Sequence, residues 1–153
     1  MRIPRAGFLA PDFNLRTLDG SHIRLSTLRG RPVLINIWAS WCIPCKAEMP
    51  SLEQIYQEYN KQGLEILAVN STIQDDPSKV LDFAHQSRLT FPILLDPTGE
   101  VPRLYNIQAL PTSFFVDASG TIREVVVGGP ISEALLRIRV EALISVIAGQ
   151  EAP

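Results

Sequence analysis

The order of apolar runs and amphipathic stretches constrains the fold of this chain more than any other feature. Three short runs are continuous in apolar side chains, at residues 32–38, 64–70 and 91–96. Such runs are typical of strands that are buried on both faces of a sheet. Helical patterns separate the runs, so we expect consecutive strand–helix–strand units.

The stretches between the runs carry helix signals. Residues 42–61 have apolar side chains at spacings of three and four, and Gly63 follows where a C-terminal cap belongs. The pair Asp76 and Pro77 resembles an N-cap followed by proline at the first helical position. This pair predicts a second helix that ends near residue 87.

Two hairpins are expected on either side of these units. The alternating segment 13–25 contains Asp19 and Gly20 at its centre, which is a strong signal for a tight hairpin turn. Near the other end, residues 112–117 and 121–127 flank the turn sequence Asp-Ala-Ser-Gly. Hairpin strands are antiparallel, so the predicted sheet is mixed.

The last predicted elements complete a layered architecture. A short helix is expected at 100–106 and an amphipathic helix at 131–149, with Ile147 on its apolar face. Charged residues in the helix expected at 131–149 are incompatible with a membrane span, so its apolar face is expected to pack on the sheet. The sequence therefore predicts an α/β fold, a three-layer α/β/α sandwich with a mixed central sheet.

Length and composition narrow the class of protein. The chain has 153 residues, 46% hydrophobic and 20% charged, so we expect one globular domain over residues 1–153. A formal net charge of −2 argues against a nucleic-acid partner, which needs a basic surface. There is no run of 18 apolar residues and no signal-peptide pattern. We therefore expect either a cytosolic protein or a domain separated from its membrane anchor.

The two cysteines, Cys42 and Cys45, lie where the first buried strand is expected to end and a helix to begin. The free N–H groups and the dipole of the first helical turn stabilise a thiolate at Cys42. Cys45 lies one turn further and should be less exposed. It is close enough to attack a mixed disulfide formed at Cys42 and to release the product. The spacing therefore predicts dithiol–disulfide exchange.

Other uses of a cysteine pair are less well supported. A structural disulfide between residues three apart closes a loop too small to give much stabilisation. A zinc site needs four ligands, but His22 is expected to be solvated and His85 to be an ordinary half-buried side chain. Two thiolates alone suit Cu(I), so a copper metallochaperone remains the alternative function.

The segment around the cysteines resembles the active site of the thioredoxin superfamily, in which W-C-x-P-C opens the first long helix; here it reads WASWCIPCKAEMP. Pro50 matches the proline that kinks this helix. The segment ALPTSFFVD matches the loop before the fourth strand, whose proline implies a cis bond between Leu110 and Pro111.

The likeness is greater to the TlpA/ResA branch of thiol–disulfide oxidoreductases, which have an AhpC/TSA- or Redoxin-type domain, and it covers nearly the whole chain. Their N-terminal hairpin is similar to APDFNLRTLDGSHIRLSTLRGRPVLINIWASWC. Their inserted helix and strand are similar to DDPSKVLDFAHQSRLTFPILLD. The resemblance implies a thioredoxin-like fold with an N-terminal hairpin and an inserted αβ segment.

The resemblance also implies a place for the substrate. The backbone of Leu110 would pair with an extended substrate by strand addition, and Pro111 would shield the sulfurs. Trp41 and Pro44 are the other expected substrate contacts, whereas Trp38 is equally well explained by core packing. No cofactor is expected.

Two positions, 36 and 48, concern the group that moves a proton to or from the cysteines during exchange. Asn36 stands where thioredoxin has a buried aspartate, and an amide cannot exchange a proton at working pH. Glu48 matches an acidic residue that some members of the branch keep near the sulfurs, so it is predicted to move the proton to or from Cys45. The alternative is a first-turn glutamate that interacts only with the helix dipole.

These observations predict a protein thiol–disulfide oxidoreductase that is recycled by a redox partner. Members of the branch frequently act as reductants in cytochrome c maturation, so the resemblance implies this role as one use of the protein. Peroxiredoxins have Thr or Ser three residues before the peroxidatic cysteine; Ala39 stands there before Cys42, which argues against a peroxidase. The branch implies an extracytoplasmic, membrane-tethered location, and we expect a monomer. The direction of electron flow is not encoded in the motif.

Overall fold

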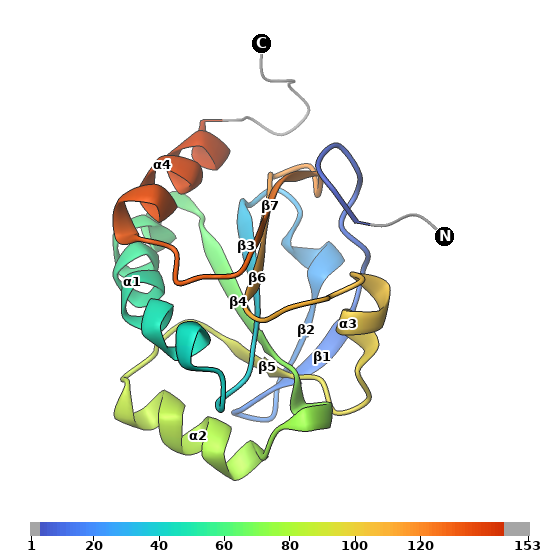
Figure 1. Cartoon of the computed structure of the whole chain (residues 1–153). Helices are drawn as coiled ribbons and strands as arrows, with labels where there is room; N and C mark the ends of the chain where they lie inside the picture. The colour runs from blue at the N-terminus through green and yellow to red at the C-terminus, as the bar shows by residue number, and fades with distance from the viewer. Residues whose placement is uncertain (1–3, 146–153) are drawn as a thin grey trace.

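One mixed sheet organises residues 4–145, the part of the chain that the computed structural model describes (Figure 1). Its strands are β1 (Asn14–Thr17), β2 (His22–Arg24), β3 (Val33–Trp38), β4 (Glu65–Asn70), β5 (Ile93–Leu95), β6 (Thr112–Val116) and β7 (Ile122–Val127). They lie in the order β2–β1–β5–β4–β3–β6–β7. The three central buried strands β3, β4 and β5 are parallel, and both predicted hairpins are antiparallel.

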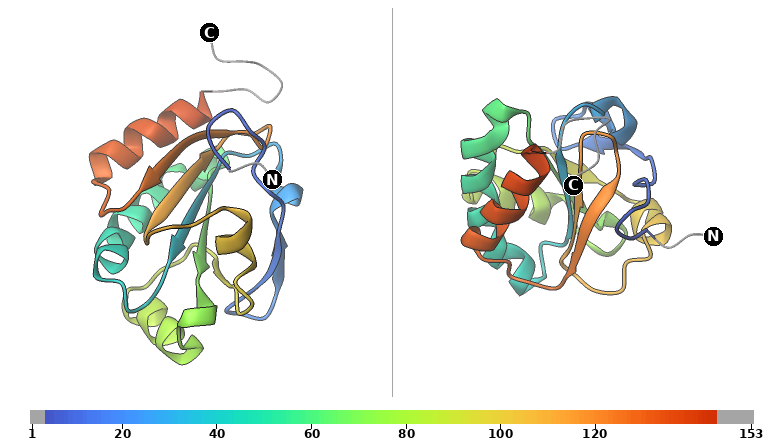
Figure 2. Two further views of the ribbon diagram at one scale, coloured as in Figure 1. Left: turned by 45° about the vertical axis from the view of Figure 1, so that its right-hand side comes forward. Right: turned by 90° about the horizontal axis from the view of Figure 1, so that it is seen from above.

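Helices cover both faces of this sheet (Figure 2). They are α1 (Ile43–Tyr59), α2 (Pro77–Gln86), α3 (Glu100–Leu104) and α4 (Glu133–Ile144). Helices α1, α2 and α4 share one buried cluster, which includes Met49, Val80 and Leu136. Helix α3 and the N-terminal segment belong to a second cluster, with Val101 and Phe13, on the other face. This confirms the predicted three-layer sandwich.

Three short 3-10 segments were not predicted: η1 (Leu25–Leu28), η2 (Asn60–Gln62) and η3 (Thr72–Gln74). Leu25, expected in the first hairpin, instead begins η1. Gly63 ends η2 rather than α1, in a left-handed conformation with φ of 96° that favours glycine.

The last helix begins later than expected. Ser132 is its N-cap and accepts a hydrogen bond from the backbone N–H of Leu135 at 3.2 Å, so the helix starts at Glu133 rather than at residue 131. Residues 146–149 of the predicted helix, with Ile147, lie outside the described residues. Among residues 4–145, no helix has the length and apolar character needed to cross a bilayer.

The junction between β3 and α1 places the two cysteines at the end of the sheet. Cys42 is the N-cap of α1, and its Sγ accepts a hydrogen bond from the backbone N–H of Cys45 at 3.2 Å. Pro44 occupies the first turn, where its missing N–H leaves no unpaired donor. Pro50 lies inside α1, where proline removes one helical hydrogen bond. The sulfurs therefore lie at the N-terminal end of α1.

Candidate active site

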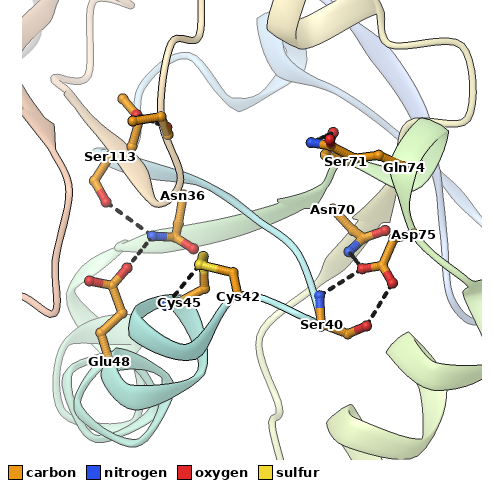
Figure 3. The surroundings of a disulfide bond; sticks show 12 residues. Asn36, Ser40, Cys42, Cys45, Glu48, Asn70, Ser71, Gln74, Asp75 and Ser113 are labelled. Carbon is orange, nitrogen blue, oxygen red and sulfur yellow. Dashed lines mark hydrogen bonds between the residues drawn. A yellow bond between two sulfur atoms is a disulfide. The ribbon is translucent and has the colours of Figure 1, made fainter.

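Cys42 and Cys45 are joined by a disulfide bond, with their Cα atoms 5.2 Å apart (Figure 3). The Cys42 side chain is 5% exposed and that of Cys45 is fully buried. Cys42 is therefore the more accessible sulfur, as its place at the helix N-terminus predicts. Its Sγ also accepts a hydrogen bond from the backbone N–H of Cys45 in the first turn of α1, which favours negative charge on this atom.

Glu48 lies on the face of α1 that is turned into the molecule, beyond a first turn that contains no acidic residue. Its side chain is only 1% exposed. One carboxylate oxygen, Oε2, accepts a hydrogen bond from Asn36 Nδ2 at 2.6 Å, and Oε1 accepts one from the backbone N–H of Ile131 at 3.1 Å. Burial raises the pKa of Glu48, while these two hydrogen bonds oppose the increase. A role limited to the helix dipole does not account for this buried position.

Asn36 connects Glu48 to the neighbouring strand. It lies on β3 directly opposite Ser113 of β6, and its Nδ2 donates a second hydrogen bond to Ser113 Oγ at 3.0 Å. Both residues are buried. The structure thus brings Asn36, Glu48 and Ser113 into one buried hydrogen-bonded group beside the Cys42–Cys45 disulfide (Figure 3).

Two loops complete this side of the site. The bond between Leu110 and Pro111 is cis, Pro111 is buried and Leu110 is partly exposed. The loop after β7 lies against them, because Gly128 N–H donates to Pro111 O at 2.7 Å. A Cβ at Gly129 would lie 2.7 Å from Glu48 Oε1 and 3.0 Å from Pro111 Cγ, so glycine is required there for space. Sequence reasoning missed this loop; its signal is the Gly-Gly-Pro sequence before α4.

The two tryptophans differ in position. Trp38 is fully buried and packs against the ring of Phe83, so it belongs to the core. Trp41 is 55% exposed, and its Nε1 donates to Gln74 O at 2.9 Å. An open groove of about 410 Å³ lies beside it, lined by Trp41, Ser71, Gln74, Pro102, Ile107, Gln108, Ala109 and Leu110. The structure thus brings Trp41 and Leu110 to one groove.

A second polar cluster, also missed from the sequence, fixes the segment that leads to Cys42. The carboxylate of Asp75 accepts hydrogen bonds from the backbone N–H and the hydroxyl of Ser40, both at 2.6 Å, and from Asn70 Nδ2 at 2.9 Å (Figure 3). Burial alone would raise the pKa of Asp75, but these hydrogen bonds outweigh it and hold the pKa below its ordinary value.

Replacing Asp75 with Ala should lower the free energy of unfolding by about 1–3 kcal/mol, because Ser40 and Asn70 lose their acceptor. Since the pKa of Asp75 is lowered in the folded state, its stabilisation is complete above the ordinary value of 3.8 and is lost as the pH falls through the lower value. Urea unfolding of the wild type and the variant between pH 2 and pH 7 measures this difference. An exposed acid on α2, Asp82, provides the control: Asp82→Ala should change stability by less than about 0.5 kcal/mol. Equal effects of the two variants would contradict the assignment.

The histidines lie away from this site. His22 is exposed, as expected, but His85 is exposed rather than half-buried, because it lies at the rim of the apolar face of α2. Within residues 4–145, no group of three or more His, Cys, Asp or Glu side chains is arranged to share a metal ion.

Comparison with known proteins agrees with this geometry. Residues 6–125 match the AhpC/TSA family. The thiol-disulfide oxidoreductase ResA of Oceanobacillus iheyensis is 42% identical over 155 residues, which cover 98% of this chain and 77% of ResA. The crystal structure of a DsbE-type thiol:disulfide interchange protein from Chlorobium tepidum is similar over 94% of this chain and all of that one, with a TM-score of 0.84 and 31% identity.

An exposed lipoprotein thioredoxin of Streptococcus pneumoniae is also similar, with a TM-score of 0.74 and 27% identity over 87% of this chain and all of that one. The family match covers most of the chain, and the relatives share the fold that carries the disulfide. The chain therefore belongs to the AhpC/TSA family of thioredoxin-like proteins and is a thiol–disulfide oxidoreductase similar to ResA.

Proposed function

We propose that Cys42 is the nucleophile and Cys45 the resolving cysteine of an exchange with protein substrates. The observation that carries the proposal is the position of Cys42, which caps α1 and is more accessible than the fully buried Cys45. A helix N-terminus lowers the pKa of a thiol, and only the thiolate attacks a disulfide. Because Cys42 is more exposed than Cys45, we assign the attack to Cys42 and the resolving step to Cys45.

The exchange needs only the cysteine pair and the substrate to account for every bond, electron and proton. The Cys42 thiolate attacks one sulfur of a substrate disulfide; a Cys42–substrate disulfide forms, and the other substrate sulfur leaves as a thiolate. Cys45 then loses its proton and attacks Cys42 Sγ, so that the Cys42–Cys45 disulfide forms and the second substrate sulfur leaves, taking up the proton. Two electrons pass to the substrate, and the reverse sequence oxidises a substrate dithiol.

Glu48 is our candidate for the group that carries this proton. It lies one helical turn beyond Cys45 on the same buried face of α1. Burial raises its pKa, which brings the carboxyl closer to the pH at which a general base operates efficiently. Asn36 and Ile131 hold both of its oxygens in place.

Replacing Glu48 with Gln should remove the pH-dependent part of the resolving step. In the wild type, the rate of this step is expected to rise with pH through the raised pKa of Glu48, because only the carboxylate accepts a proton. The variant should lack this rise and be slower by about 100-fold or more at neutral pH. Stopped-flow measurement of mixed-disulfide decay against pH tests this. The control is Glu53→Gln, a half-buried position of α1 whose carboxylate is hydrogen-bonded to Thr90. An unchanged pH profile would remove Glu48 from the mechanism.

The groove beside Trp41 is the proposed binding site for the substrate. It runs to Leu110, next to the cis proline, and none of the eight residues that line it is charged. The backbone of Leu110 would pair with an extended substrate segment, Pro111 would cover the sulfurs, and Trp41 and Pro44 would contact the residues that flank the substrate cysteine.

The physiological role proposed is reduction of disulfides outside the cytoplasm, by a domain tethered to the membrane and recycled by a redox partner. The support is the similarity to an exposed lipoprotein thioredoxin and to ResA. Cytochrome c maturation is the pathway we propose for this reductant. Reduced protein should then convert the disulfide of an apocytochrome peptide with a C-x-x-C-H sequence to the dithiol, and failure to do so would refute this role.

Equilibration of the protein with glutathione buffers, followed by alkylation and mass measurement, tests the proposed function. Exchange requires that Cys42 and Cys45 pass together between disulfide and dithiol as one two-electron couple. A Cu(I) titration of the reduced protein against a competing chelator tests the metallochaperone alternative. Tight copper binding by a protein that does not exchange with disulfide substrates would favour that alternative.

A further inference from the structure

Asn36 is fully buried and has one polar atom without a partner. Both hydrogens of its Nδ2 are engaged, by Glu48 Oε2 at 2.6 Å and by Ser113 Oγ at 3.0 Å. Its Oδ1, in contrast, has no hydrogen-bond partner within the described part of the chain. Buried carbonyl oxygens are nearly always paired, so this atom calls for an explanation.

The orientation of this amide is determined by its neighbours. Rotating the side chain by half a turn would place Oδ1 against the Glu48 carboxylate, where two acceptors would face each other without a hydrogen. The hydrogen bond to a charged carboxylate is also the stronger of the two that Nδ2 makes. Oδ1 is therefore directed away from Glu48.

Figure 3 shows that Oδ1 points toward the disulfide. The contacts are consistent with this view: Cys45 and Glu48 are three residues apart on one face of α1, so a side chain that bonds to Glu48 lies over the turn that holds Cys45. In the disulfide, the Cys45 sulfur carries no hydrogen and cannot donate to Oδ1. The missing donor appears only when the disulfide is reduced.

We propose that Asn36 Oδ1 accepts a hydrogen bond from the thiol of Cys45 in the reduced protein. Reduction by a substrate dithiol breaks the Cys42–Cys45 bond and transfers two electrons to the pair, while the substrate becomes a disulfide and releases two protons. Cys45 takes up one of these protons, Cys42 becomes the thiolate, and the second proton passes to solvent. The new S–H group is a weak donor that meets an acceptor already in place. This inference rests on the proposed function, because it concerns the reduced state of the same cysteine pair.

Asn36 is thereby a positioning residue for both partners of the proton transfer. Its oxygen holds the proton on Cys45, and its nitrogen holds the Glu48 carboxylate that receives the proton. A hydrogen bond donated by the thiol favours the neutral form of Cys45. Cys45 therefore stays protonated while Cys42 attacks, and only Cys42 is the nucleophile of the first step.

The first test uses the wild-type protein. In labelled protein, the 13Cγ resonance of Asn36 is expected to move downfield on reduction, because its carbonyl gains a hydrogen bond. Asn70 is the internal control: it is equally buried, and its Oδ1 already accepts a hydrogen bond from Thr72 Oγ at 2.8 Å. An unmoved Asn36 resonance, or an equal movement of both, would overturn the inference.

The second test observes the thiol itself. In Cys42→Ser protein the S–H stretching band comes from Cys45 alone, and a hydrogen bond lowers its frequency. Adding Asn36→Leu should raise the frequency, whereas adding Ser113→Ala, which removes only a partner of Nδ2, should leave it unchanged. Equal bands in all three proteins, or equal shifts in both double variants, would contradict the inference.

Exchange with a substrate disulfide is measured on the same wild-type sample. Loss of exchange would refute the proposed function. Normal exchange combined with an unmoved Asn36 resonance would refute only the role of Asn36. The Asn36→Leu variant is not needed for this decision, so a failure of that variant to fold does not affect it.

Discussion

Replacement of Cys42 with Ser is expected to abolish thiol–disulfide exchange, with a loss of rate of at least about 1,000-fold. The hydroxyl of serine does not ionise near neutral pH and cannot form a mixed disulfide. Cys45 cannot take over the attack, because it is fully buried beneath the first turn of α1. Reduction of a peptide disulfide, followed by the release of free thiol, measures the loss.

The fold should tolerate this change. Cys42 caps α1 through its sulfur, and serine is itself a favoured N-cap residue. The reduced wild type is the matched control for stability, because it also lacks the disulfide. Substantial exchange by Cys42→Ser, at more than about one-tenth of the wild-type rate, would contradict the assigned nucleophile.

Replacement of Gly129 with Ala is expected to destabilise the protein and to disturb the site, although Gly129 carries no reactive group. A methyl group there would lie 2.7 Å from Glu48 Oε1 and 3.0 Å from Pro111 Cγ. Both oxygens of Glu48 are held by hydrogen bonds, so the carboxylate cannot move aside without losing one of them. We expect the free energy of unfolding to fall by about 1–3 kcal/mol, as in other overpacked sites, and Tm to fall by about 3–10 °C.

Gly129→Ala should also displace the pH dependence of the resolving step, because it disturbs the surroundings of Glu48. Gly128→Ala is the control: a Cβ at Gly128 has no atom within 4 Å, but its φ of +88° makes the backbone unfavourable for alanine. The control should lose some stability and keep the wild-type pH profile. Identical pH profiles for all three proteins would show that Gly129 does not shape the environment of Glu48.

The fold was predictable because its signals are local. Strand runs such as 32–38, the turn at Asp19 and Gly20 and the cap at Asp76 each act within a few residues, and all three are present in the structure. The position of Cys42 at a helix N-terminus was predictable for the same reason. The roles of the site residues stay predictions, which the variants above test.

The missed features depend on contacts between distant segments. Ser40 and Asp75 are 35 residues apart, and Ile131 and Glu48 are 83 apart, so no local pattern signals either pair. The requirement for glycine at Gly129 comes from the packing of three segments and is invisible in its own neighbourhood. The sequence could indicate an acid at residue 48, but only the structure shows that it is buried and held by Asn36.

The central claim is that Cys42 attacks and Cys45 resolves. Mass spectrometry of Cys45→Ser protein mixed with a peptide disulfide tests this claim most directly, with Cys42→Ser and wild type treated in parallel. We predict a stable adduct of one peptide on Cys42 in Cys45→Ser protein, no adduct in Cys42→Ser, and only a transient adduct in the wild type. An adduct that forms on Cys45 at a comparable rate in Cys42→Ser protein, or a Cys45→Ser protein that forms none, would contradict the account.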